Sequence, residues 1–245
     1  MTTSAPDQAR TLTVEIWSDI ACPWCYIGKK RFETALADFP FRDHVEVRWR
    51  SYELSPTTPA GPGRPEIDAL SEMKGIPRSQ AERMFAQVTA VAAGEGLTYD
   101  FERTLAVNTF DGHRLVHLAA SAGLADAVLE ALYSAHFEQG ADLGEDETLV
   151  RVVADAGLDA NEARAVLAGN DHADAVRHDE AEARAIGVTG VPFFVVDRRL
   201  GVSGAQPADV FTQLLAEGWK AANPLATLVG ADPSAQACLD DTCAI

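Results

Sequence analysis

The sequence predicts an α/β protein in which a large all-helical insert interrupts a small sheet domain. Three observations predict this class: strand and helix patterns alternate over residues 11–56, helical patterns dominate residues 57–186, and strand patterns return over 187–220. We therefore expect a discontinuous sheet domain (11–56 and 187–220), a helical insert domain (57–186) and a flexible C-terminal tail (221–245).

The first sheet segment has the order strand, helix, strand. Residues 11–17, TLTVEIW, are rich in β-branched residues and predict a strand, whereas residues 26–39 place apolar residues at helical spacing. Residues 44–54, HVEVRWRSYEL, then alternate, with Val45 and Val47 on one face. This pattern is typical of a half-buried strand.

The insert is predicted to be a compact helical bundle between about residues 66 and 186. Its helical segments differ too much in spacing for a regular repeat. Several end in a glycine suited to a left-handed C-cap: Gly123, Gly140, Gly157 and Gly169. After the insert, VPFFVVDRRLGVSG predicts a hairpin, and Pro207 opens a final amphipathic helix.

Composition narrows the class of partner. The chain of 245 residues is 47% hydrophobic and carries a formal net charge of -17, which leaves no basic face to neutralise phosphates. We therefore expect a protein or small-molecule partner, with no nucleic acid and no membrane. The N-terminal residues have no signal-peptide pattern and no later stretch approaches a membrane span, so we expect a cytoplasmic protein.

Two of the four cysteines form the motif CPWC directly after the first predicted strand. Pro23 fits the first helical position, which puts Cys22 at the N-cap and Cys25 in the first turn. Unpaired backbone N–H groups and the helix dipole stabilise a thiolate at the N-cap, as a nucleophile needs. Cys25, shielded beneath the turn, would resolve a mixed disulfide, and two thiols exchange disulfides without a cofactor.

Several stretches together resemble a known family. CPWC after a strand, the helical insert and GVTGVPFF before the last hairpin resemble the DsbA-type thioredoxin superfamily. SDIACPWCYIGKKRFE and NTFDGHRLVHLA resemble its FrnE-like branch of disulfide oxidoreductases, and the resemblance covers roughly residues 12–218. It implies a thioredoxin-like fold and a thiol–disulfide oxidoreductase that acts on thiol- or disulfide-bearing protein clients. Glutathione or the thioredoxin system would recycle it, and no cofactor is expected.

The resemblance also assigns roles near the second sheet segment. It implies that Pro192 follows a cis peptide bond and faces the CxxC motif, so that Val191 can pair with a substrate peptide. Pro23 and Trp24 would contact the substrate too, and Tyr26 would border the same groove. DsbA itself carries histidine between its cysteines, whereas the neutral Trp24 offers no charge to a thiolate. We therefore expect a less oxidising couple than DsbA.

The tail holds the other two cysteines, Cys238 and Cys243. A flexible connection of ~20 residues spans about 25 Å root-mean-square, more than the radius of gyration of about 18 Å expected for the folded body. The tail can therefore reach Cys22. Either it supplies a secondary redox pair that exchanges with the first, or it holds an inert or structural disulfide.

Other interpretations of these residues remain open. Zinc could use all four cysteines, but the first pair opens a helix in a large core, where structural zinc is unusual, and we expect no metal. His113 and His117, four residues apart, are either metal ligands or packing residues, and Asp19 either tunes the thiols or forms a turn. Alternative functions are a glutathione-dependent isomerase or transferase of the 2-hydroxychromene-2-carboxylate isomerase/kappa class, and a zinc- or redox-controlled client-binding protein.

Overall fold

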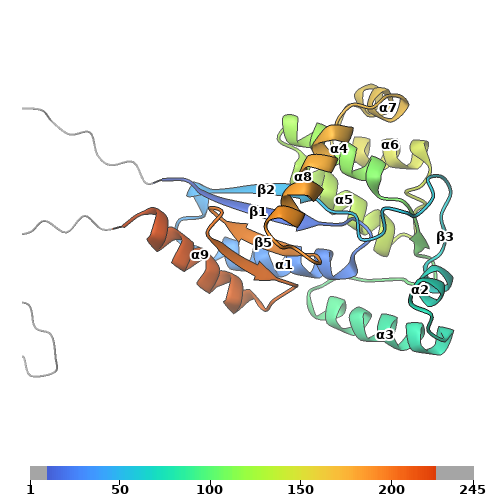
Figure 1. Cartoon of the computed structure of the whole chain (residues 1–245), viewed down its shortest axis with the longest axis horizontal. Helices are drawn as coiled ribbons and strands as arrows, with labels where there is room; N and C mark the ends of the chain where they lie inside the picture. The colour runs from blue at the N-terminus through green and yellow to red at the C-terminus, as the bar shows by residue number, and fades with distance from the viewer. Residues whose placement is uncertain (1–9, 225–245) are drawn as a thin grey trace, which may run out of the picture.

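The computed structural model describes residues 10–224, and its centre is a four-stranded mixed sheet (Figure 1). The strands are β1 (Leu12–Ser18), β2 (Val45–Ser51), β5 (Phe193–Val196) and β6 (Leu200–Ser203), in the order β2-β1-β5-β6. β1 is parallel to β2 and antiparallel to β5. The strand order therefore places the first segment of the chain beside the last.

One face of the sheet is covered by α1 (Pro23–Ala37) and α9 (Ala208–Ala222), as Figure 1 shows. Val14 and Ile16 of β1 point into this layer and pack with Phe32 of α1 and Phe211 of α9, all at 2% exposure or less. Because side chains alternate along a strand, the neighbours of Val14 and Ile16 face the other side. There α8 (Ala173–Ala185) covers only the end of the sheet that holds Trp17.

The insert forms the helical half of the molecule, as its periodicity predicted. Besides α8 it contains α2 (Glu66–Lys74), α3 (Arg78–Gly94), α4 (Phe110–Ser121), α5 (Ala125–Phe137), α6 (Asp146–Asp155) and α7 (Ala160–Ala168). The sequence did not predict the short antiparallel pair of β3 (Arg64–Pro65) and β4 (Leu105–Ala106), nor the 3-10 turn η1 (Arg42–His44). The division into two domains stays a prediction.

Glycines lie just after three of these helices in the predicted left-handed conformation. Gly123 follows α4 with φ 72°, Gly140 lies just after α5 with φ 65° and Gly157 follows α6 with φ 101°. The same prediction is wrong for Gly169, whose φ of -119° is extended. At that point the chain leaves α7 and turns towards α8 without a left-handed cap.

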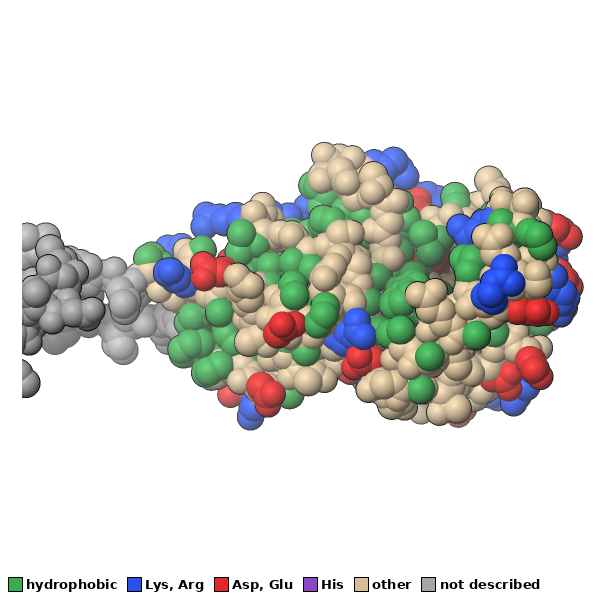
Figure 2. Space-filling model, turned by 90° about the horizontal axis from the view of Figure 1, so that it is seen from below, with side chains coloured by type: hydrophobic (Ala, Val, Ile, Leu, Met, Phe, Trp, Pro, Cys, Tyr) green, Lys and Arg blue, Asp and Glu red, His purple; other side chains and the backbone are tan. Residues whose placement is uncertain are grey.

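Hydrophobic side chains gather in a hollow in the middle of the face seen from below in Figure 2. Inside the molecule, the largest buried cluster joins the insert to the start of α1, since Cys22, Cys25 and Tyr26 pack in one core with Leu115 and Leu132.

Within residues 10–224 no helix is long and apolar enough to cross a membrane.

Candidate active site

The CPWC motif lies where β1 passes into α1. Cys22 is the N-cap, with extended backbone angles (φ -96°, ψ 110°), and Pro23 is the first helical residue, both as predicted. The backbone N–H of Cys22 donates to the Asp19 carbonyl at 3.1 Å, and that of Cys25 donates to the Cys22 carbonyl at 3.0 Å. These bonds fix both cysteines in the first turn, where unpaired helix N–H groups favour negative charge.

The two thiols differ in their surroundings, although both are buried and unbridged. Cys22 is 4% exposed and Cys25 is 1% exposed. Burial raises the pKa of Cys25 well above its ordinary value, and hydrogen bonding and repulsion from Cys22 raise it further. Cys25 therefore holds its proton at neutral pH.

The segment facing the cysteines comes from the far end of the chain. The Val191–Pro192 peptide bond is cis, as the resemblance implied. The Cys22 thiol donates to the Val191 carbonyl at 3.6 Å, within the range for a sulfur donor. A Cβ built on Gly28 would lie 2.9 Å from Cγ of Pro192, so glycine in α1 allows the proline to pack directly against that helix.

The two aromatic residues next to the cysteines lie in different environments. Trp24 is 39% exposed, which is compatible with a surface for substrate. Tyr26 is 2% exposed, and the prediction that it borders a groove is wrong. Its ring stacks on Tyr133 at 4.9 Å and lies 6.2 Å from the ring of Tyr99, so two tyrosines of the insert cover it.

Contacts from the insert support the motif, and no pattern in the sequence predicted them. The hydroxyl of Tyr99 donates to the Pro23 carbonyl at 2.7 Å, and the hydroxyls of Tyr133 and Ser18 are hydrogen-bonded to each other. No local motif surrounds either tyrosine. Their partners lie 76 and 115 residues away in the chain, so a single sequence offers no signal for them.

Asp19 is a buried carboxylate below the motif, 2% exposed. It accepts from the Leu54 N–H at 2.7 Å and lies 3.4 Å from Nε2 of His113. Burial acts to raise the pKa of Asp19, but pairing with His113 and the Leu54 hydrogen bond outweigh burial and lower it. Burial raises the pKa of Glu66, at the start of α2, to about 7, and repulsion from the negative charge of Asp19 contributes to this rise.

The two predicted histidine candidates turn to different partners. His113 faces Asp19, whereas His117 lies 3.0 Å from the Asp179 carboxylate and 3.1 Å from the Ser51 hydroxyl. Among the residues described, no group of three or more His, Cys, Asp or Glu side chains could hold a metal ion. The two histidines therefore contact different carboxylates, and the expectation that they are packing residues stays a prediction.

Cys238 and Cys243 lie outside the described residues, so the position of the tail pair relative to Cys22 stays a prediction. For the remaining predicted site residues, the fold brings Cys22, Cys25, Pro23, Val191 and Pro192 together at one end of the sheet.

Comparison with known proteins defines the class. The chain matches the DSBA-like thioredoxin domain family over residues 13–216 and belongs to that family. Its fold is accordingly the DsbA-like thioredoxin fold that the sequence predicted. The narrower FrnE-like assignment stays a prediction.

Solved structures give particular relatives. A probable DsbA oxidoreductase from Streptomyces coelicolor is 49% identical, with a TM-score of 0.83 over 96% of this chain and 99% of that one. The cytosolic disulfide reductase DsbM from Pseudomonas aeruginosa, solved with glutathione, is 18% identical with a TM-score of 0.59 over 84% and 98%. A 2-hydroxychromene-2-carboxylate isomerase is 15% identical with a TM-score of 0.60 over 84% and 94%. The last two show a shared fold alone.

Proposed function

We propose that this protein is a thiol–disulfide oxidoreductase that exchanges disulfides with protein or small-thiol substrates through Cys22 and Cys25. One observation carries the proposal: the helix start holds the Cys22 thiol against the Val191–Pro192 segment, with Cys25 buried directly behind it. Membership of the DSBA-like family supports the same reaction class.

The reaction in the reducing direction has two displacements. Cys22, as a thiolate, attacks one sulfur of the substrate disulfide, which forms a mixed disulfide and releases the first substrate thiolate. Cys25 then loses its proton and attacks Sγ of Cys22, so that the second substrate thiol leaves and a Cys22–Cys25 disulfide remains. Oxidation of a substrate is the reverse sequence. Burial raises the pKa of Cys25, so this thiol has to give up its proton before the second displacement can occur.

The substrate would lie along the exposed rim of the motif. Trp24 offers a partly exposed aromatic surface, and the Val191 backbone lies beside Cys22, where an extended peptide could pair with it. Thiol- or disulfide-bearing proteins and glutathione are therefore the proposed partners. A neighbour of the same fold is a cytosolic disulfide reductase solved with glutathione, which supports a cytoplasmic setting for this chain. The neutral Trp24 between the cysteines supports a couple less oxidising than that of DsbA.

The experiment is insulin reduction in the presence of dithiothreitol or glutathione. We expect turnover in the native protein and none in Cys22→Ser, because the nucleophile is absent. Cys25→Ser should instead accumulate a mixed disulfide with the substrate, since the first displacement remains. Full turnover by Cys22→Ser would overturn the proposal.

We further propose that Cys238 and Cys243 form a secondary redox pair that exchanges with Cys22. Disulfide mapping of Cys25→Ser by mass spectrometry should find Cys22 bonded to one of the two tail cysteines. A Cys238–Cys243 bridge alone, with unchanged turnover in Cys238→Ser/Cys243→Ser, would leave the tail without a catalytic role.

The isomerase alternative makes a contrasting prediction. A glutathione-dependent isomerase would keep its activity in Cys22→Ser/Cys25→Ser, because that reaction needs bound glutathione rather than a dithiol. We expect no such activity. Stoichiometric zinc that is lost with Cys22 would favour the client-binding alternative instead.

A further inference from the structure

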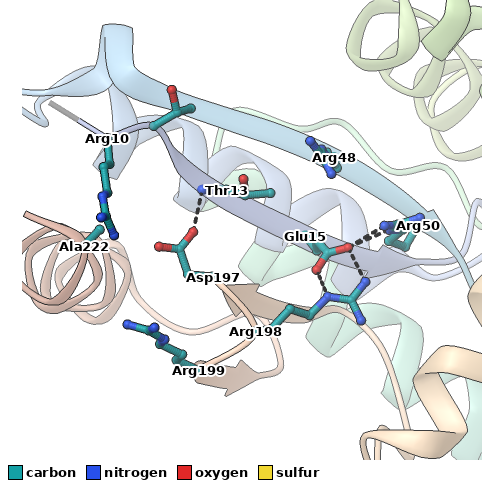
Figure 3. Close-up of a pocket in the computed structure, with 10 residues that line it drawn as sticks. Arg10, Thr13, Glu15, Arg48, Arg50, Asp197, Arg198, Arg199 and Ala222 are labelled. Atoms are coloured by element: carbon teal, nitrogen blue, oxygen red, sulfur yellow. Dashed lines mark hydrogen bonds and ion pairs between the residues drawn. The ribbon is translucent and has the colours of Figure 1, made fainter. Parts of the chain in front are cut away.

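An arginine-lined pocket lies on the sheet face that α1 and α9 leave uncovered (Figure 3). It has a volume of about 380 Å³, within the range of small-molecule sites. Its walls come from the segment entering β1, from β2, from the β5–β6 turn and from the end of α9. The arginines that line it are Arg10, Arg48, Arg50, Arg198 and Arg199.

This pocket gathers arginines in a chain that is acidic as a whole. Five of the chain's 20 Lys and Arg residues line it, against two acids, Glu15 and Asp197, although the chain as a whole carries -17. Segments separated by more than 140 residues bring their arginines to one cavity.

Both acidic side chains in the pocket accept hydrogen bonds from residues of its walls. The Glu15 carboxylate is 3% exposed and is hydrogen-bonded by Arg50 at 2.9 Å and by Arg198 at 2.7 Å (Figure 3). The Asp197 carboxylate accepts from the backbone N–H of Thr13 at 2.9 Å. Glu15 therefore holds two guanidinium groups in place, and Asp197 ties the turn to β1.

The remaining arginines are more open to solvent. Arg48 pairs with Glu46 at 2.8 Å, but both side chains are about half exposed, so water screens that pair. In Figure 3, Arg10 and Arg199 lie at the same end of the pocket, near Asp197 and Ala222. Outside the lining, Arg50 also pairs with Asp179 at 2.9 Å and Arg198 with Glu182 at 3.0 Å. Among the described residues Arg10 and Arg199 have no ion-pair partner, so these two cations, with Arg48 in its screened pair, are the ones available to an anion.

The type of cation indicates the type of ligand. All five are arginines, whose planar guanidinium groups match carboxylate and phosphate oxygens in pairs. We propose that this pocket binds a small multivalent oxyanion, a compound with two or more carboxylate or phosphate groups. This pocket is separate from the thiols. Arg10 precedes β1, whereas Cys22 follows the opposite end of that strand, and the strand is about 23 Å long.

The test is calorimetric titration of the full chain with pyrophosphate and, separately, with citrate, at about 20 mM salt, where charge screening is weak. We expect saturable binding of at least one probe with a dissociation constant below about 1 mM. Arg48→Gln/Arg199→Gln should weaken that binding at least about tenfold, since two cations of the pocket are lost. Arg164→Gln is the matched control, because Arg164 is exposed and pairs with Glu147 on a distant helix.

The outcomes separate the two sources of oxyanion and can refute the site. Tighter pyrophosphate binding assigns the pocket to phosphorylated compounds, and tighter citrate binding assigns it to polycarboxylates. Insulin reduction should be unchanged in Arg48→Gln/Arg199→Gln, since neither residue contacts the thiols. Absence of binding by both probes, or equal binding in the pocket variant and the Arg164→Gln control, would overturn the proposal.

Discussion

His136 in α5 makes the stability of this protein depend on pH in a calculable way. The side chain is 1% exposed, its ring lies 4.5 Å from that of Phe137, and within residues 10–224 neither ring nitrogen has a hydrogen-bond partner. Burial lowers the pKa of His136 from 6.5 to about 4. The folded protein therefore keeps this imidazole neutral where an unfolded chain would protonate it.

Proton linkage gives the direction in which stability changes with pH. Between pH 6.5 and 4 the unfolded chain binds a proton that the folded chain does not, so stability is present above pH 6.5 and is lost as the pH falls. The pKa difference of about 2.5 corresponds to at most about 3.4 kcal/mol at 1.36 kcal/mol for each pKa unit. Between pH 7.5 and 5.5 the same linkage gives a loss of about 1.3 kcal/mol.

Urea unfolding of His136→Leu at these two pH values measures this loss. The native protein should lose about 1.3 kcal/mol more than the variant between pH 7.5 and 5.5, because leucine cannot titrate. His178→Leu, at a side chain that is 67% exposed, is the control and should follow the native protein. If His136→Leu lost as much stability as the native protein, burial of His136 would not be the cause.

Two further predictions concern the support of the motif. Gly28→Ala should destabilise the protein by about 1–3 kcal/mol in urea unfolding, because the new Cβ would lie 2.9 Å from Cγ of Pro192. Gly94→Ala, where no atom lies within 4 Å, should instead be neutral or stabilising by up to about 1 kcal/mol, and equal losses in the two variants would refute the steric argument. Asp19→Asn should cost about 1–3 kcal/mol at pH 7 in the same assay, since it removes the charge that accepts the Leu54 N–H and faces a histidine. An unchanged midpoint for Asp19→Asn would show that this buried charge contributes no stability.

Much of the local structure was readable in the sequence. The alternation of residues 44–54 predicted β2, and the helical spacing of residues 26–39 predicted α1. Pro23 predicted the start of α1 to the residue, because a proline without an N–H fits the first helical position and few others. These features depend on interactions within a few residues of one another, and a single sequence contains all of them.

The surroundings of the motif were not readable in the same way. Tyr26 is apolar enough for either a groove or a core, and only the packing of Tyr99 and Tyr133 across the insert decides for the core. The family resemblance, rather than any local pattern, placed Pro192 opposite Cys22. Contacts across such separations depend on how whole helices and strands pack, which periodicity does not report.

The sequence by itself determined the four strands of the main sheet, the helical character of the insert and the position of Cys22 at a helix start. It could do so because backbone sterics, capping and hydrophobic periodicity act locally. Only the tertiary structure decided which groups surround that cysteine. It also gathered arginines from β2 and the β5–β6 turn into one pocket of a strongly acidic chain. The physical reason is that charge and shape at a site are sums over neighbours in space, and those neighbours are fixed only when distant segments pack together.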